Sequence, residues 1–231
     1  MDENDSTVDL EKAKMTALAE MADVIGHDIK NPLSNIKNGL YFLKKALDSQ
    51  DARVLRMLEI IDREVVHIAG ILENLTGYAR QRPPTLRPTA VGEVVEEAIG
   101  GLSLPETVKL INRTPSGLPT CNLDRSEIRL VLLNLLSNAV EACESEEGGV
   151  VEVDAATDDE GNLRLRISDN GKGMAAAELA EIHKPFTTTK GGHTGLGMAA
   201  VKNLVQRHGG RLELSSEVGR GTEVDLRLPI A

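Results

Sequence analysis

Apolar residues in the first third of the chain recur with a helical period. Between Val8 and Leu47 they are spaced by three, four and seven, which places them in one narrow stripe along a helix. After a polar break at residues 48–51, a second stripe on heptad spacing runs from Leu58 to Leu75. We expect an antiparallel helical hairpin. The stripes comprise Leu18, Ala22, Ile25, Ile29, Ile36, Leu40, Leu43 and Leu47, then Leu58, Ile61, Val65, Ile68, Leu72 and Leu75.

A single hairpin cannot bury both sides of its apolar surface, whereas two hairpins from two chains can close a four-helix bundle. We therefore expect a homodimer; the alternative is a hairpin packed on the rest of its own chain. Prolines after the second helix end it, because proline lacks an N–H donor. The predicted organisation is a hairpin domain at 1–82, a linker at 83–90 and a second domain at 91–231.

The second domain mixes helical and strand patterns, and Asp124 is a good N-cap for its longest helix. Helices that alternate with antiparallel strand pairs predict an α/β sandwich, with helices on one face of a mixed sheet. The whole chain is thus expected to be α+β. Helices are predicted at 91–102, 124–143 and 195–208, and strands at 107–113, 150–156, 163–168, 211–216 and 223–228.

Composition narrows the range of partners and compartments. The 231 residues carry a net charge of -10, so no basic face favours nucleic acid. Apolar runs fall short of the roughly 20 residues that a membrane span needs, and the acidic N-terminus does not resemble a signal peptide. Cys121 and Cys143 fit reduced structural thiols. We expect a cytoplasmic chain, either soluble or the cytoplasmic part of a larger sensor.

The first helix contains a candidate nucleophile in the string His27-Asp-Ile-Lys-Asn-Pro32. Helical geometry turns His27 away from the apolar stripe toward solvent, with Asn31 one turn later on the same face. A neutral imidazole has a nucleophilic nitrogen, and Asp28 could hold the other ring N–H. Taken alone, an exposed His beside an Asp is more often a solvated pair.

Candidate nucleotide contacts lie in the second domain. Asn134 and Asn138 share one helix face, where neutral carboxamides could coordinate Mg²⁺ or simply face water. Asp169 ends a strand before Gly171 and Gly173, so its carboxylate could accept an adenine amine while the glycines permit close approach. By itself that string is only a turn.

A glycine pair precedes the helix predicted at 195–208. Gly195-Leu196-Gly197 could present backbone N–H groups to phosphates, and the polar stretch 175–193 before it fits a mobile lid. The spacing matches neither a Walker A loop nor a Rossmann fingerprint.

Together these motifs resemble a known family. The string at His27 resembles the phosphoacceptor box of sensor histidine kinases. The asparagine pair, the Asp-x-Gly-x-Gly string, the Phe-containing segment at 185–190 and the Gly-x-Gly resemble, in order, the N, G1, F and G2 boxes of Bergerat-fold ATPases, and Gly219–Thr222 matches a further glycine motif. The resemblance covers the chain from His27 onward.

The resemblance implies an ATP-dependent histidine kinase that uses ATP and Mg²⁺. It would phosphorylate its own His27 and pass the phosphoryl group to an aspartate on a response regulator receiver domain. Asp28 would be the base, and Asn31 would position water when the same helix dephosphorylates the partner. Asn138 would bind Mg²⁺ and Asp169 would read the adenine. The other implied nucleotide contacts are Asn134, Gly171, Gly173, Lys190, Gly195, Leu196 and Gly197, with Lys172 as an alternative to Lys190.

Within the family that the chain resembles, the residue at one position, Asn134 here, differs between kinases and ATP-hydrolysing enzymes. Hydrolysing relatives have a glutamate where this chain has Asn134, and an asparagine is a poor base for activating water. The site is therefore suited to holding ATP for another nucleophile. The alternatives are a nucleotide-regulated phosphatase or scaffold that lacks kinase activity, and an ATP-hydrolysing machine, which Asn134 disfavours.

Overall fold

The computed structural model describes residues 29–45, 52–143, 148–188 and 194–230. The chain divides into two compact units, Met1–Gln81 and Arg82–Ala231. Among the helices of these described ranges, none combines the length and the apolar character that a bilayer crossing requires.

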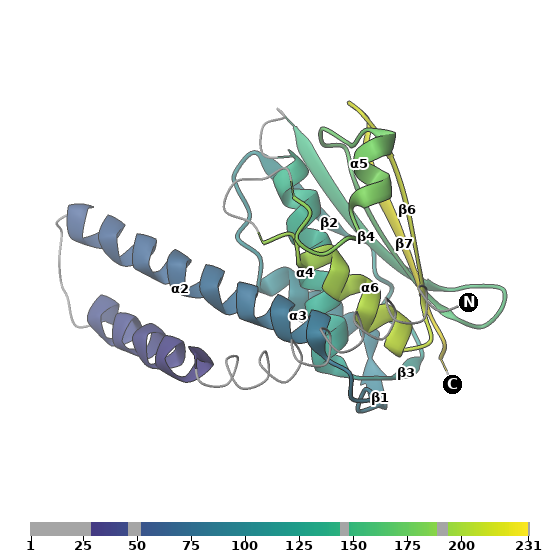
Figure 1. The fold of residues 1–231 in the computed structure, drawn as a ribbon, viewed down its shortest axis with the longest axis horizontal. Coiled ribbons are helices and arrows are strands. Elements are labelled where there is room, and N and C mark those ends of the chain that lie inside the picture. The colour runs from purple at the N-terminus through teal and green to yellow at the C-terminus, as the bar shows by residue number, and fades with distance from the viewer. Residues whose placement is uncertain (1–28, 46–51, 144–147, 189–193, 231) are drawn as a thin grey trace, which may run out of the picture. The chain divides into compact units, whose positions relative to one another are not determined.

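The first unit contains an antiparallel helical hairpin (Figure 1). Its first helix covers the described residues 29–45, and α2 spans Ala52–Ala79. Ion pairs between described residues join the helices: Lys44 lies 2.8 Å from Asp62, and Lys30 lies 3.6 Å from Glu73. Because the earlier lysine pairs with the later acid, the two helices run in opposite directions, as the sequence predicts.

The hairpin buries only part of the predicted apolar stripes. Its core consists of Leu33, Leu40, Leu58, Val65 and Leu72. A second set of large apolar residues, seven positions apart on each helix, is 38–49% exposed: Ile29, Ile36, Leu43, Ile61 and Ile68. We predicted one apolar stripe on each helix, whereas the structure divides the apolar residues into a buried set and this exposed set. The exposed set is an apolar surface that the hairpin alone leaves open to solvent.

The second unit is built on a five-stranded sheet with the order β2-β4-β5-β7-β6. All neighbours pair antiparallel except β2 and β4, which are parallel. The elements are β1 (Arg87–Ala90), α3 (Val91–Gly100), β2 (Val108–Asn112), β3 (Thr120–Leu123), α4 (Arg125–Cys143), β4 (Gly149–Thr157), β5 (Leu163–Asp169), α5 (Ala176–Glu181), α6 (Gly197–Arg207), β6 (Arg211–Glu217) and β7 (Gly221–Leu228).

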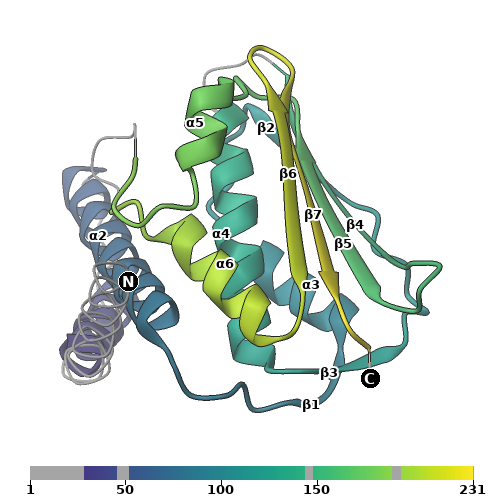
Figure 2. The ribbon, with the colours of Figure 1, turned by 45° about the vertical axis from the view of Figure 1, so that its right-hand side comes forward.

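The sheet and the helices form two layers, which confirms the predicted fold class. Figure 2 shows α3, α4 and α6 on one face of the sheet. Alternate residues of β4 and β5, such as Val153 and Leu165, are fully buried under these helices. The opposite face carries cross-strand ion pairs, including Arg164 with Asp225 and Arg166 with Glu223.

Three short elements of this unit were not predicted, namely β1, β3 and α5. Residues 87–90, expected within the linker, form β1 and pair antiparallel with β3. Pro88 suits the edge of this small two-stranded sheet, but it also masks the strand pattern. The helix α5 occupies the start of the stretch expected to be a lid and contacts β6.

Candidate functional site

The first two residues of the predicted phosphoacceptor string lie outside the described residues. His27 and Asp28 fall before residue 29, whereas Asn31 is exposed on the first helix. The helix continues through Pro32, and the Ser34 hydroxyl donates a hydrogen bond to the Lys30 carbonyl at 2.8 Å. Leu33 is buried in the hairpin core, so Asn31, two residues earlier, faces away from that core.

The asparagine pair lies in the middle of α4, on the helix that packs against both β4 and β5. Asn134 and Asn138 are half-buried and one turn apart, and each is followed by a buried residue, Leu135 and Ala139. The Asn134 side-chain nitrogen donates to the Leu130 carbonyl at 3.0 Å. This bond fixes the rotation of the carboxamide and directs its nitrogen toward the helix backbone.

Asp169 is the last residue of β5, and two backbone donors hold its half-buried carboxylate. Its Oδ1 accepts the N–H of Gly171 at 2.9 Å and the N–H of Thr222 at 3.2 Å. The sequence predicted a glycine motif at Gly219–Thr222 but not this contact between Thr222 and Asp169. A carboxylate held by donors from two separate segments keeps one orientation, as recognition of a base requires.

The turn after Asp169 fits tightly between α4 and the β6–β7 turn. The Lys172 N–H donates to the Ala142 carbonyl at 3.0 Å, and the Gly219 N–H donates to the Lys172 carbonyl at 2.8 Å. A Cβ at Gly171 would lie 2.4 Å from the Ala142 oxygen. At Gly173, where φ is +61°, it would lie 2.0 Å from the Glu217 oxygen. Both glycines are therefore required by backbone packing.

The Gly195–Gly197 segment leads into α6, which begins at Gly197. Gly195 has φ +66°, and its carbonyl accepts the N–H of Phe186 at 3.1 Å. The Leu196 side chain is buried, so only its backbone can contact a ligand. Among the described residues, no side-chain hydrogen bond from the N-cap residue Leu196 caps α6. Backbone N–H groups at such a start suit an anion. Lys190 lies outside the described residues.

The two helices that carry these motifs lie next to each other. The helix α6 contacts α4 along the same face of the sheet (Figure 2). The Asp169 turn meets the C-terminal end of α4 at Ala142. The fold thus gathers the asparagine pair, the aspartate turn and the glycine pair on three elements that touch α4 or belong to it.

The residues of this region suit Mg²⁺, which needs few ligands from the protein, better than a metal ion that is coordinated entirely by protein side chains. The described ranges contain no group of three or more His, Cys, Asp or Glu side chains placed to hold a metal. Mg²⁺ prefers oxygen ligands and commonly takes only one or two of them from the protein, with phosphates and water supplying the rest. A carboxamide oxygen at Asn138 suits that need.

Comparisons with protein families match both units. Residues 123–231 match the family described as histidine kinase-, DNA gyrase B-, and HSP90-like ATPase. Residues 17–84 match the His Kinase A phospho-acceptor domain. The ATPase match includes all the described nucleotide motif residues, and the phospho-acceptor match includes His27.

Similar full-length proteins are sensor kinases. The chain is 31% identical over 223 residues to the sensor histidine kinase ZraS of Klebsiella oxytoca, covering 95% of this chain and 47% of that protein. It is 29% identical over 232 residues to the sensory histidine kinase/phosphatase NtrB of Escherichia coli O157:H7, covering 96% and 65%. The chain thus spans about half the length of ZraS.

Solved structures agree on the fold. Full-length ShkA, in complex with AMPPNP, superposes with a TM-score of 0.68 at 24% identity, over 92% of this chain and 46% of that one. The mycobacterial sensor histidine kinase MprB superposes with a TM-score of 0.55 at 27% identity, over 62% and 97%.

Proposed function

The chain belongs to the sensor histidine kinase family, as the catalytic core, and from that premise we propose that it transfers the γ-phosphoryl group of Mg-ATP to its own His27. The observation that carries the proposal is the presence of both matching domains in one chain, a phospho-acceptor domain followed by an ATPase domain. The phosphorylated histidine would then pass the group to an aspartate of a receiver domain.

In the proposed reaction, a ring nitrogen of His27 attacks the γ-phosphorus. The new P–N bond forms while the bond from that phosphorus to the bridging oxygen breaks, and ADP leaves. Asp28 accepts or holds the proton on the other ring nitrogen, which keeps the attacking nitrogen unprotonated. Asn31, exposed one turn after His27, would orient water when the phosphorylated partner is hydrolysed.

We assign one role in nucleotide binding to each motif. Asp169, held by two backbone N–H groups, would accept the exocyclic amine of adenine. Gly171 and Gly173 would pass beside the base, and Gly195, Leu196 and Gly197 would present backbone N–H groups to the phosphates. Asn138, with Asn134 beside it, would hold Mg²⁺, and Lys190 would add positive charge. The bound ion would neutralise charge on the triphosphate.

The kinase reaction is favoured over ATP hydrolysis because α4 offers no base at the asparagine pair. Asn134 stands where a hydrolase needs a carboxylate, and its nitrogen is engaged by the Leu130 carbonyl. A carboxamide does not take a proton from water at neutral pH. ATP bound here would therefore persist until a nucleophile such as His27 arrives.

Dimerisation belongs to the same proposal. The exposed apolar residues of the hairpin, among them Ile36 and Ile68, would pack against a second hairpin to close a four-helix bundle. The response regulator would dock on the bundle near His27. Both assignments rest on the apolar surface of the hairpin and on the family of the chain.

The test is phosphate incorporation from labelled Mg-ATP by the full chain. We expect an acid-labile, alkali-stable label that is lost in His27→Gln. The matched control is His67→Gln, the other histidine of this unit, exposed on α2, which should keep full labelling. In Asp169→Asn we expect lost nucleotide binding together with lost labelling. Full labelling of His27→Gln would contradict the proposed phosphoacceptor.

A further inference from the structure

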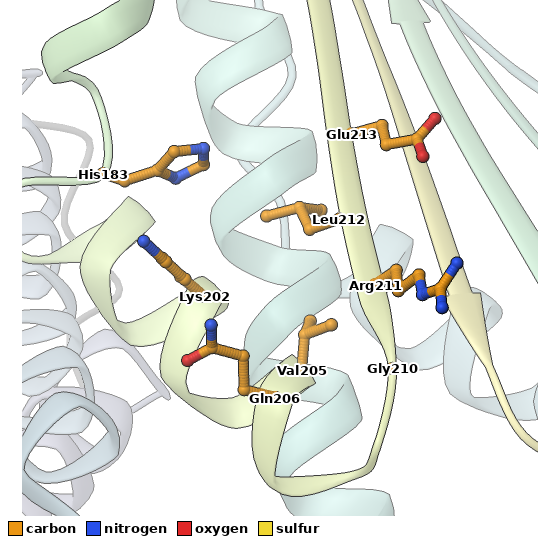
Figure 3. A pocket seen from close by; sticks show the side chains of 8 residues that line it. All are labelled: His183, Lys202, Val205, Gln206, Gly210, Arg211, Leu212 and Glu213. Atoms are coloured by element: carbon orange, nitrogen blue, oxygen red, sulfur yellow. The ribbon is translucent and has the colours of Figure 1, made fainter.

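The second unit has an open pocket of about 320 Å³ that contains none of the nucleotide motif residues. It lies between the C-terminal half of α6 and the first residues of β6, with His183 at one end (Figure 3). The strand β6 is an edge of the sheet. A volume near 300 Å³ is at the lower end of what small-molecule sites have, on the order of 300–1,000 Å³.

The pocket has an apolar wall and polar groups above it. Val205, which is buried, and Leu212, which is half-buried, form the wall. Lys202 and Gln206 lie one turn apart on α6 and are exposed. Figure 3 shows Lys202 extending from α6 toward the His183 ring. A ligand that fits here needs an apolar body and a polar head.

His183 carries a polar atom whose position calls for a ligand. Its Nδ1 is buried and has no hydrogen-bond partner among the described residues. Burial lowers the pKa of His183, and the nearby positive charge of Lys202 lowers that pKa further. Buried polar atoms in folded proteins nearly always have a partner, and a ligand could supply one to this nitrogen if the ring turned toward the pocket.

The charge of the pocket is positive. Within the described ranges, Lys202 forms no ion pair. Glu213 contributes to the lining, but Figure 3 shows its side chain on the opposite face of β6, and Arg211 points the same way. The nearest acid in sequence to His183, Glu181, is bound to Lys184 at 2.6 Å.

We propose that this pocket binds a small amphipathic carboxylate. Its aliphatic body would lie against Val205 and Leu212, and its carboxylate would accept hydrogen bonds from Lys202 and from Nδ1–H of His183. Gln206 would donate a third bond through its side-chain amide. A neutral molecule of the same shape would leave Lys202 without its counter-charge. This site goes beyond the proposed kinase function.

Each wall of the pocket continues into the nucleotide motifs. The helix α6 starts at Gly197, and β6 ends at Glu217, whose carbonyl packs against Gly173. His183 precedes Phe186, whose N–H bonds the Gly195 carbonyl. A bound acid would therefore change nucleotide affinity, by about fivefold or more. This coupling, unlike the binding itself, rests on the proposed function.

The experiment uses the full chain with 4-methylpentanoate as the probe and 4-methylpentanamide as its neutral counterpart. The methyl NMR signals of Val205 and Leu212 report occupancy. We expect saturable shifts at millimolar acid, at least tenfold weaker binding of the amide, and loss of the shifts in Lys202→Met. Lys109→Met is the matched control, because this exposed lysine of β2 does not line the pocket, and it should leave acid binding unchanged.

The absence of saturable shifts would overturn the proposal, as would equal affinity for acid and amide or unchanged binding in Lys202→Met. The coupling is measured as the affinity for a non-hydrolysable ATP analogue with and without saturating acid. Acid binding with unchanged nucleotide affinity would refute the coupling alone. The affinity for the analogue without acid reports separately on the proposed nucleotide site.

Discussion

Replacing Arg207 by methionine should destabilise the second unit, because this residue neutralises a buried carboxylate. Arg207 lies 3.0 Å from Glu127, and their side chains are 12% and 2% exposed. His208 cannot take over this role without a cost, since its Nε2 accepts the Asp124 N–H at 3.1 Å while Nδ1 meets the Leu204 carbonyl at 2.8 Å. That pattern requires a neutral ring.

Removal of one partner from a buried ion pair costs about 3–5 kcal/mol. Total domain stability is on the order of 5–15 kcal/mol, so the Arg207→Met variant should lose a large share of it. The double variant that also carries Glu127→Met removes the buried carboxylate as well. It should recover most of the loss, since apolar replacements of a whole buried pair are often close to neutral.

The two cysteines provide an assay that reports on this unit alone. The chain has two cysteines, Cys121 and Cys143, which both lie in the second unit and are at most 1% exposed. Burial also raises the pKa of the Cys121 thiol, which lowers its reactivity in the folded state. A thiol reagent therefore labels them when the unit opens, and the labelling rate follows the free energy of opening.

A loss of 3–5 kcal/mol corresponds to about two to three and a half orders of magnitude in the labelling rate of Arg207→Met. The double variant should label at least tenfold more slowly than that single variant. The contrary result would be additivity. If the double variant labels at the rate predicted by adding the free-energy losses of Arg207→Met and Glu127→Met, then Arg207 is not needed to neutralise Glu127, and the reasoning is wrong.

Three further outcomes are expected. Gly173→Ala should lower the free energy of unfolding by at least about 3 kcal/mol in the same labelling assay, because the added Cβ would lie 2.0 Å from the Glu217 carbonyl oxygen. Gly117→Ala is the control and should be nearly neutral, because a Cβ there has nothing within 4 Å. Ile36→Glu should shift the full chain toward monomer by about a hundredfold or more in ultracentrifugation, and an unchanged dimer would remove Ile36 from the interface. His183→Gln should make stability less dependent on pH. Because the folded-state pKa of His183 is lowered, the parent loses stability as pH falls below the ordinary histidine value of about 6.5, and urea midpoints across that range should show a shallower loss in the variant.

The sequence predicted the long elements of the second unit because their periodicity is strong. The helix expected at 124–143 is observed as α4 from Arg125, and Asp124 does cap it, since its Oδ1 accepts the Glu127 N–H at 3.3 Å. Strands with regular alternation, such as β5, were placed within a residue or two. A segment of four residues, such as β1, carries too few alternations to be distinguished from a linker.

Contacts between distant segments explain what the sequence could not predict. The hydrogen bond from Thr222 to Asp169 joins residues 53 positions apart, and no local pattern encodes it. The hairpin core differs from the predicted apolar stripe for a related reason. Heptad spacing places apolar residues on one side of a helix but does not tell which of two adjacent surfaces faces the partner helix. Leu33 therefore belongs to the core, whereas Ile36 does not.

The cluster around Arg207 also bears on the linker predicted at residues 83–90. The Arg207 guanidinium donates to the Arg82 carbonyl, and the Thr85 N–H donates to Asp124 at 3.0 Å. The strand β1, which follows, pairs with β3. Residues 82–90 are thus attached to the ends of α4 and α6, the two helices that carry the asparagine and glycine motifs. Bending within 83–90 would break these bonds, so we expect any hinge to lie before Arg82, with the segment that follows moving as part of the nucleotide unit.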